Sequence, residues 1–321
     1  MKKIKMRLYR ELRINGVQQP DSLSADLTRS QLKIRNTIIC HLSGGLANQM
    51  ICYKLGRYLA DTKGFALMLD ASAYENLEST SNRNLQLLNY HIQYNAVLFS
   101  GSILKNILTN NAFTSLSGKG LSDFHNPEIK SKALAAVNNS ESIIYCDLWG
   151  GLVLREIADK HASENGVLDH LKINRNEHFT ERDFACLKSI TRARNSVAIH
   201  VRRGDFSRHD GGLLVTHNFY NNSIKEMEDK LEDAVFYVFS DDIPWCKENL
   251  KARSMMHFVD FNGEQNAFKD MSLAASCKHF ILSNESTFSH QIWELSDKSQ
   301  DGIVIRSDLS KLDRNSIVDG A

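Results

Sequence analysis

The C-terminal part of the sequence repeats one pattern three times: a short apolar run passes directly into a polar turn. The runs are VAIHV, VFYVF and HFILS, and the turns after them begin RRGD, SDD and NESTFS. Apolar runs without alternation are typical of strands that are covered on both faces, as in a parallel sheet. Ligands of open α/β sheets bind beyond the carboxyl ends of the strands, so the three turns are predicted to border one site.

The N-terminal part has the same design. Residues 37–42 (TIICHL) predict a strand, the residues after Ser43-Gly44-Gly45 have helical spacing, and residues 65–70 (FALMLD) predict a second strand after Gly64 ends the helix. This order is a βαβ unit. Further helices are expected at 101–109 and 127–137, a strand at 142–148, and an amphipathic helix within NEHFTERDFACLKSITRARN. We expect an extension at 1–36 and two domains at 37–190 and 191–321.

Composition limits the partners and the compartment. Lys and Arg (39) nearly balance Asp and Glu (38), so the chain lacks the basic character of a nucleic-acid binder. The six cysteines show no C-x-x-C pair and are expected to be reduced core residues. Without a secretory signal or an apolar span the protein is expected in the cytoplasm, where the sequons at Asn138, Asn221 and Asn284 stay unused. The basic residues 1–14 either contact an anionic membrane surface peripherally or form a solvated extension.

The first polar turn contains Arg202 and Arg203, directly after a predicted buried strand. The planar guanidinium fork matches phosphate oxygens, so the pair suits a phosphate or diphosphate, and Gly204 lets the backbone bend close to it. Two other interpretations remain. An arginine can simply pair with Asp205 or with solvent, and the Arg-Gly-Asp tripeptide resembles an adhesion signal, which a cytoplasmic protein would not use.

The second turn holds Ser240, Asp241 and Asp242. Asp242 is predicted to cap a helix that has Pro244 in its first turn, which leaves Ser240 and Asp241 at the strand end. A carboxylate there can accept hydrogen bonds from a purine or a ribose. The alternative is a Mg²⁺ site made by Asp241 and Asp242 with substrate phosphates.

The third turn places Asn284, Ser286, Thr287 and Ser289 where a helix should begin. Helix N-termini present unpaired N–H groups to anions, so this turn can complete a phosphate site. Its hydroxyl residues can equally be plain helix caps.

The glycine turn of the N-terminal part, SGGLAN, resembles a dinucleotide-binding loop. It lacks the fingerprint G-x-G-x-x-G, because Gly44 and Gly45 are adjacent and Asn48 and Gln49 occupy later positions. An NAD site is therefore weakly supported. Asn48 and Gln49 can hydrogen-bond a sugar hydroxyl, or they can cap the turn.

Four stretches, in this order, resemble the bacterial α-1,2-fucosyltransferases of glycosyltransferase family 11: HLSGGLANQMICYKLGRYLA, HVRRGDF, FSDDIPWCKENL and MSLAASCKHFILSNESTFS. The H-x-R-R-x-D segment is also similar to one in the α-1,6- and protein O-fucosyltransferases. The resemblance implies a GT-B-like α/β fold, with two Rossmann-like parallel-sheet domains facing a cleft. It implies inverting, metal-independent transfer of L-fucose from GDP-L-fucose to the 2-hydroxyl of a galactose. The implied acceptor is a cell-surface glycan of the O-antigen type, free or lipid-linked, and no cofactor is implied.

The resemblance also implies roles for individual residues. Arg202 holds the diphosphate as a catalytic and donor-binding residue, and His200, Arg203 and Asp205 lie beside it. The other implied donor-binding residues are Ser240, Asp241, Asn284, Ser286, Thr287 and Ser289. Asn48, as a further catalytic residue, and Gln49 bind the acceptor.

Two features depart from the family pattern. Ala47 stands where glycine is usual, and SHQIWEL replaces a tryptophan-rich stretch. Two alternatives to a fucosyltransferase remain on sequence grounds. The first is an NAD-type or nucleotide-sugar oxidoreductase or epimerase that uses the Gly44-Gly45 turn, and the second is a non-catalytic module that binds a nucleotide or a sugar.

Overall fold

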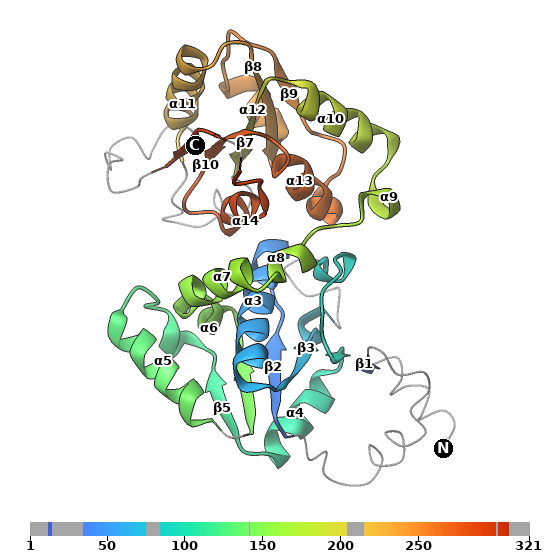
Figure 1. Cartoon of the computed structure of the whole chain (residues 1–321), viewed down its shortest axis with the longest axis vertical. Coiled ribbons are helices and arrows are strands. Elements are labelled where there is room, and N and C mark those ends of the chain that lie inside the picture. Colours follow the sequence, from blue (N-terminus) through green and yellow to red (C-terminus); the bar gives the residue numbers. More distant parts are fainter. Residues whose placement is uncertain are drawn as a thin grey trace. The chain divides into compact units, whose positions relative to one another are not determined.

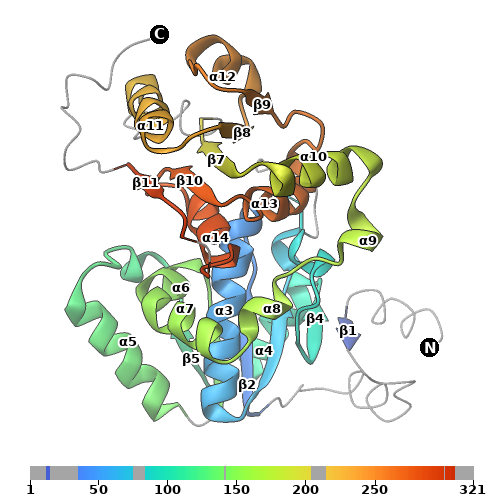
Figure 2. The same cartoon turned by 45° about the horizontal axis from the view of Figure 1, so that its top comes forward.

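A computed structural model describes residues 12–14, 35–74, 84–140, 142–203, 215–299 and 301–307. The chain divides into two compact units, unit 1 (Met1–Leu171) and unit 2 (Lys172–Ala321). Each unit has its own sheet with helices around it (Figures 1 and 2). The predicted class, α/β with two parallel-sheet domains, is confirmed.

The sheet of unit 1 has six strands in the order β1-β4-β3-β2-β6-β5, and all pairs except β1–β4 are parallel. The chain adds β3 and β4 on one side of β2 and then returns to add β5 and β6 on the other side. The strands are β1 (Leu12–Ile14), β2 (Thr37–His41), β3 (Ala66–Asp70), β4 (Ala96–Leu98), β5 (Phe113–Leu116) and β6 (Ile143–Cys146).

Helices cover both faces of this sheet. On one face the long helix α3 (Leu46–Lys63) approaches the strands closely, since a Cβ on Gly56 would lie 2.8 Å from the side chain of Leu67. On the other face α4 (Gly101–Asn110) packs through Ile107 against Ile39 and Leu98. The remaining helices are α5 (Pro127–Asn139), α6 (Leu148–Val153), α7 (Arg155–Glu164) and α8 (Val167–His170), with 3-10 turns η1 (Ser72–Tyr74), η2 (Leu87–Asn89) and η3 (Lys119–Leu121).

The sheet of unit 2 has five parallel strands in the order β11-β10-β7-β8-β9. Its strands are β7 (Asn195–Val201), β8 (Ala234–Ser240), β9 (Met256–Phe258), β10 (His279–Leu282) and β11 (Val304–Arg306). Its helices are α9 (Arg175–His178), α10 (Glu181–Arg192), α11 (His217–Lys230), α12 (Ile243–Asn249), α13 (Ala267–Ala274) and α14 (Thr287–Leu295), with the 3-10 turn η5 (Glu264–Asn266). All seven residues of β7 are buried, as its apolar sequence predicted.

The boundary between the units lies earlier than the expected position between residues 190 and 191. The reason is that α9 and α10 pack on unit 2. The Arg175 guanidinium donates to the Ser276 hydroxyl (2.7 Å), and the Ser189 hydroxyl lies 2.7 Å from that of Tyr237 on β8. The amphipathic helix was predicted in sequence, but only its packing shows which sheet it covers.

The N-terminal extension also differs from the prediction. Residues 12–14, expected within an extension at 1–36, form β1 and pair antiparallel with β4 at the edge of the sheet. An open edge of β4 offers unpaired backbone groups, which β1 satisfies. The rest of the basic segment 1–14 lies outside the described residues. None of the described helices is both long enough and apolar enough to cross a membrane.

The structure confirms the predicted ends of two helices and the absence of disulfides among the six cysteines. Gly64 ends α3 in the left-handed conformation (φ 66°), and Asp242 caps α12, which has proline in its first turn. All six cysteines are unpaired, and all except the half-buried Cys186 are buried.

A partly buried residue, Asp270, places its carboxyl group between α10 and α13. The Asn262 amide donates to Asp270 (2.7 Å), and burial, together with the charge of Asp183, raises the pKa of Asp270 to about 7. The folded protein therefore holds this proton more tightly than the unfolded chain between about pH 4 and pH 7. The free energy of unfolding should fall as pH rises across this range, because the buried group must ionise.

We expect Asp270→Asn to stabilise the protein at pH 8 by about 2 kcal/mol, since a buried charge is removed and the contact to Asn262 can be kept. At pH 5 the difference should nearly vanish, because Asp270 is then protonated. Thermal unfolding of both proteins at the two pH values measures this. The exposed Asp260, which pairs with Lys247, provides the control Asp260→Asn. Equal effects of Asp270→Asn at both pH values would contradict the prediction.

Candidate functional site

The three polar turns of unit 2 lie side by side. The strands β10, β7 and β8 are direct neighbours in the parallel sheet, so their carboxyl ends meet at one edge. The chain builds β8 and β9 on one side of β7 and then crosses to place β10 on the other side, which makes the end of β7 a topological switch point. Crevices at such points are the usual ligand sites of open α/β sheets.

Arg202, at the end of β7, is held by the next strand. Its guanidinium lies 2.7 Å from a carboxylate oxygen of Asp241, and the other oxygen of Asp241 accepts the backbone N–H of Arg203 (2.9 Å). The side chains of Arg202 and Asp241 are 20% and 24% exposed, so the pair is sheltered but accessible from solvent. A charge-assisted contact of this kind fixes the direction of a guanidinium before a ligand arrives.

Arg203 is fixed by different groups. Its guanidinium stacks 3.9 Å from the centre of the Trp245 ring, and its Nε lies 3.4 Å from a carboxylate oxygen of Asp242. Neither Trp245 nor the stacking was predicted from the sequence. The sequence did place Trp245 three residues after the capping Asp242, in the first turn of α12, but it did not show that Arg203 reaches this ring.

The turn after β8 is ordered by its own side chains. The Asp242 carboxylate accepts the backbone N–H of Trp245 (3.1 Å), which is the predicted helix cap. The Ser240 hydroxyl accepts the backbone N–H of Asp242 (2.9 Å). Both carboxylates of the Mg²⁺ alternative thus have partners within the protein: Asp241 holds Arg202, and Asp242 caps α12 beside Arg203.

The turn after β10 leads into α14 (Figure 2). Ser286 is the N-cap, and its hydroxyl accepts the backbone N–H of Ser289 (3.4 Å). The Ser289 hydroxyl lies 2.7 Å from Nδ1 of His200, and Ser289 is completely buried. In this conformation Ser289 therefore connects α14 to β7, and its hydroxyl is not accessible to the phosphate that the sequence resemblance implied.

His200 supports the site through its contacts with Phe288, Ser289 and Tyr220, and not through Arg202. Its ring stacks on Phe288 with a centroid distance of 4.9 Å, and its backbone carbonyl accepts from the Tyr220 hydroxyl (3.4 Å). Burial lowers the pKa of His200 to about 4, and the charge of Asp241 only partly offsets it. His200 is therefore neutral at pH 7. It contributes a fixed position for α14 and no positive charge.

Asn284 is also used within the fold. Its amide donates to the carbonyl of Ser307 (2.5 Å), and its backbone N–H donates to the Ser307 hydroxyl (2.9 Å). This ties the end of β10 to the end of β11. Half-buried Thr287 begins α14, and Gly204 and Asp205 lie outside the described residues.

In unit 1 the glycine turn precedes α3. Gly44 adopts a positive φ of 70°, which only glycine adopts easily, and the side-chain nitrogen of Asn48 lies 2.9 Å from where a Cβ of Gly44 would be. The Gly44 carbonyl accepts from the Tyr74 hydroxyl (2.8 Å) and from the Gln49 amide (3.0 Å). Half-buried Asn48 thus covers the turn at the start of α3.

Gln49 is completely buried, and its amide makes four contacts. The nitrogen donates to the carbonyls of Gly44 and Asn84, and the oxygen accepts the backbone N–H groups of Gln86 and Leu87. Both donors and both acceptor positions are occupied. Gln49 therefore connects residues 84–87 to the glycine turn. Its amide has no free hydrogen-bonding group for the predicted contact with an acceptor.

One pair at the edge of unit 1 was not predicted. Nδ1 of His41 lies 2.5 Å from a carboxylate oxygen of Asp70, and the two residues are direct partners at the ends of β2 and β3. The predicted strand 37–42 ends one residue later, at Leu42, whereas β2 ends at His41, so the strand end that places His41 beside Asp70 was not predicted.

Residues 155–310 match the family model described as Glycosyl transferase family 11. This match includes all three polar turns of unit 2. This part of the chain is similar to glycosyltransferase family 11. Within the matched residues the arginine pair, the capped turn after β8 and the start of α14 form the edge described above.

Two bacterial relatives extend the similarity over most of the chain. The chain is 28% identical over 263 residues to the Alpha-1,2-colitosyltransferase of Escherichia coli, covering 78% of this chain and 84% of the relative. It is 29% identical over 274 residues to the O-antigen biosynthesis glycosyltransferase WbnK of Escherichia coli, covering 77% and 86%. A shorter match of 100 residues at 30% identity, covering 30% of this chain and 27% of the relative, is to Galactoside alpha-(1,2)-fucosyltransferase 1 of Saimiri sciureus.

Solved structures support the fold. The structure of fucosyltransferase NodZ from Bradyrhizobium matches with a TM-score of 0.52 at 15% identity, covering 84% of this chain and 96% of NodZ. The structure of Arabidopsis thaliana FUT1 matches with a TM-score of 0.51 at 12% identity, covering 96% and 79%. The chain thus has a GT-B-like fold of two parallel-sheet domains.

Proposed function

We propose that the protein transfers L-fucose from GDP-L-fucose to the 2-hydroxyl of a galactose residue in a cell-surface glycan of the O-antigen type. The observation that carries the proposal is Arg202, which Asp241 holds 2.7 Å away at the switch point of unit 2, within the residues that match the family 11 model. The names of the relatives support the α-1,2 linkage and the O-antigen acceptor.

The chemistry follows from the charges at this edge. When the bond between the sugar and GDP breaks, negative charge develops on the β-phosphate while the anomeric carbon becomes positive. A guanidinium that is already oriented stabilises this transition state more than the ground state. We therefore place the diphosphate against Arg202 and the first turn of α14, where Thr287 is half-buried and helix N–H groups favour an anion.

Arginine supplies the countercharge that a metal would otherwise give, so we propose a metal-independent reaction. Transfer to the face opposite the leaving group inverts the anomeric carbon. We propose the cytoplasm as the compartment, with the basic residues 1–14 as a segment that can contact the inner membrane surface and a lipid-linked glycan as one form of the acceptor.

A second donor sugar is favoured by one specific observation. The relative with 28% identity over 78% of this chain is a colitosyltransferase, so transfer of colitose from its GDP-sugar is the rival proposal. The two proposals share the nucleotide site and differ only in the groups that contact the sugar.

The test is to incubate the protein with GDP-fucose or GDP-colitose and a panel of free and lipid-linked β-galactosides, with EDTA present. The product's linkage and anomeric configuration are then determined. We expect an α-1,2-fucosyl galactoside. Preferential use of GDP-colitose would show that colitose, and not fucose, is the donor sugar. GDP binding without turnover would support a non-catalytic module. Tight NAD binding without GDP binding would support an oxidoreductase. Activity only after metal is added would overturn metal independence.

A further inference from the structure

The carboxyl edge of the unit 1 sheet contains a histidine–carboxylate pair that the proposed reaction has not yet used. His41 and Asp70 end the neighbouring strands β2 and β3, and Nδ1 lies 2.5 Å from the carboxylate. In unit 1 β3 and β4 lie on one side of β2, and β5 and β6 lie on the other, so His41 lies at the switch point of its sheet. Switch points are where open α/β sheets bind ligands.

The pair has the arrangement of an oriented base. Asp70 is completely buried, and its second oxygen accepts the backbone N–H of Ser72 (3.0 Å), so the carboxylate is fixed. A carboxylate only accepts hydrogen bonds, so Nδ1 of His41 carries the hydrogen and the lone pair lies on Nε2. The His41 side chain is 24% exposed. Among the described residues, Asp70 is the hydrogen-bond partner of the ring.

The surroundings favour a base that works near neutral pH. Burial lowers the pKa of His41, but the hydrogen bond and charge of Asp70, with the charge of Asp147, outweigh burial and raise it. Tyr145 on β6 is the other titratable neighbour, with its ring 6.3 Å from that of His41, and burial raises its pKa, so it stays neutral. Asp147 is occupied as the cap of α6, where it accepts the backbone N–H of Trp149 (2.9 Å).

We propose that His41 is the general base that takes the proton from the acceptor hydroxyl, and that Asp70 is the residue that positions it. The inference rests on the proposed function, because it needs an acceptor hydroxyl as nucleophile. It places the reacting end of the acceptor at the carboxyl edge of β2 and β3, beside the Gly44 turn.

The step balances with the groups named. The hydroxyl oxygen of the acceptor forms a bond to the anomeric carbon of the donor sugar. The bond from that carbon to the β-phosphate oxygen breaks, and its electron pair leaves with GDP. The hydroxyl proton moves to Nε2 of His41, which becomes an imidazolium stabilised by Asp70. Release of this proton to solvent returns the base to its starting state.

The first test is the variant His41→Gln. Gln can still donate to Asp70 but cannot accept a proton at neutral pH. We expect kcat for transfer to fall at least ~100-fold, the usual contribution of a general base. The affinity for GDP, measured by calorimetry, should stay unchanged because the nucleotide is proposed to bind unit 2.

The second readout is the pH profile of kcat. In the wild type, activity should rise with pH as His41 loses its proton, with the midpoint at the raised pKa of His41. Asp70→Asn removes the charge that raises this pKa, so the rise should move to lower pH. In His41→Gln the rise should be absent. Loss of a purely structural contact would lower activity at all pH values without moving the profile.

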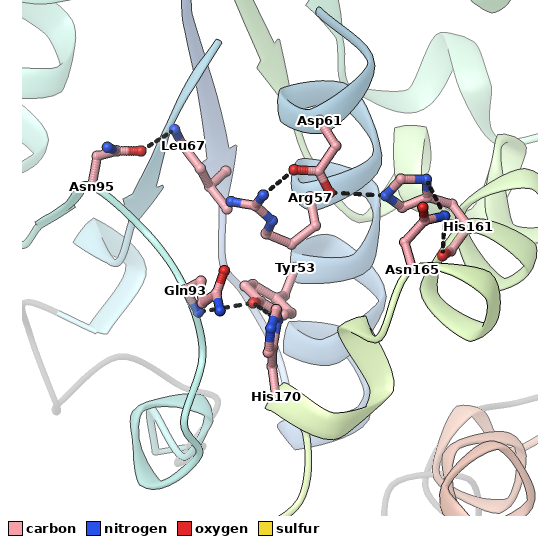
Figure 3. Close-up of polar contacts among 9 residues, drawn as sticks. All are labelled: Tyr53, Arg57, Asp61, Leu67, Gln93, Asn95, His161, Asn165 and His170. Carbon is pink, nitrogen blue, oxygen red and sulfur yellow. Dashed lines mark hydrogen bonds and ion pairs between the residues drawn. The ribbon is translucent and has the colours of Figure 1, made fainter. Parts of the chain in front are cut away.

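Unit 1 offers a matched control, which Figure 3 shows. His161 on α7 lies with its Nε2 2.9 Å from a carboxylate oxygen of Asp61 near the C-terminal end of α3, so it is also a histidine–aspartate pair. Asp61 is about 20 Å along α3 from the glycine turn. His161→Gln should leave both kcat and the pH profile unchanged.

The outcomes separate the two proposals. If the wild type transfers no sugar from any GDP donor, the proposed function is overturned, and the base goes with it. If the wild type transfers sugar and His41→Gln does so at a similar rate with the same pH profile, only the base is overturned. If Asp70→Asn fails to fold, His41→Gln at the half-buried position 41 still decides whether His41 is the base. Its rate and its pH profile are measured independently of Asp70→Asn.

Discussion

Arg202→Ala is expected to lower kcat for transfer of fucose by about 100- to 1,000-fold, the usual loss when an oriented charge at the transition state is removed. Arg202 lies at the switch point of unit 2, and Asp241 fixes its guanidinium 2.7 Å away. Arg202→Lys should recover only part of the rate, because an ammonium lacks the planar fork that matches two phosphate oxygens. Steady-state kinetics with GDP-fucose, in EDTA, measure both variants.

A control for this prediction lies at the opposite ends of β7 and β8. Arg194, just before β7, pairs with Glu232 at 3.6 Å, and the side chains are 75% and 81% exposed. Exposed pairs of this kind contribute less than about 1 kcal/mol to stability. Arg194→Ala should therefore keep wild-type kinetics, although it also removes an arginine next to the same strand. Full activity of Arg202→Ala would show that the diphosphate is held elsewhere.

Asp241→Ala is expected to lower kcat by about 10- to 100-fold, although the variant removes a negative charge from a site that is proposed to bind an anion. The reason is that Asp241 holds the Arg202 guanidinium and the Arg203 backbone N–H at once. Without it, the guanidinium must be ordered during the reaction. A simple electrostatic view predicts the opposite sign, tighter binding of GDP and no loss of rate.

A double variant separates these explanations. If Asp241 acts by positioning Arg202, the kcat of Arg202→Ala with Asp241→Ala should equal that of Arg202→Ala alone. If Asp241 instead contacts the donor nucleotide directly, in line with the donor-binding role that the family resemblance implied, its effect should persist in the Arg202→Ala background. It should then appear mainly as weaker GDP affinity.

The sequence alone predicted the strands and turns that form the edge of unit 2 where we propose that the nucleotide binds. Apolar runs before Arg202, Ser240 and Asn284 were sufficient, because parallel strands bring their carboxyl ends to one edge whatever their order. Helix ends at Gly64 and Asp242 were also predictable, since they depend on local backbone geometry and capping.

Other features depend on contacts between residues distant in sequence, and these were missed or assigned differently. Gln49 looked like a sugar-binding amide, but the carbonyl of Asn84 and the N–H groups of residues 86–87 occupy it. Ser289 looked like a phosphate contact, but its hydroxyl lies against His200. The pairing of His41 with Asp70 depends on the register of β2 and β3, which residue types alone did not reveal.

The strand order of unit 2 has a consequence for synthesis of the chain. β7 pairs with β8 soon after it is made, but its other edge pairs with β10, which follows more than seventy residues later. A nascent chain on the ribosome therefore carries an open, apolar strand edge until Leu282 has emerged, and such edges attract other chains. Arg202, which is proposed to bind the donor, directly follows this same strand, β7. A chain truncated before β10 would therefore expose an unpaired edge of β7 and lack part of the proposed donor site.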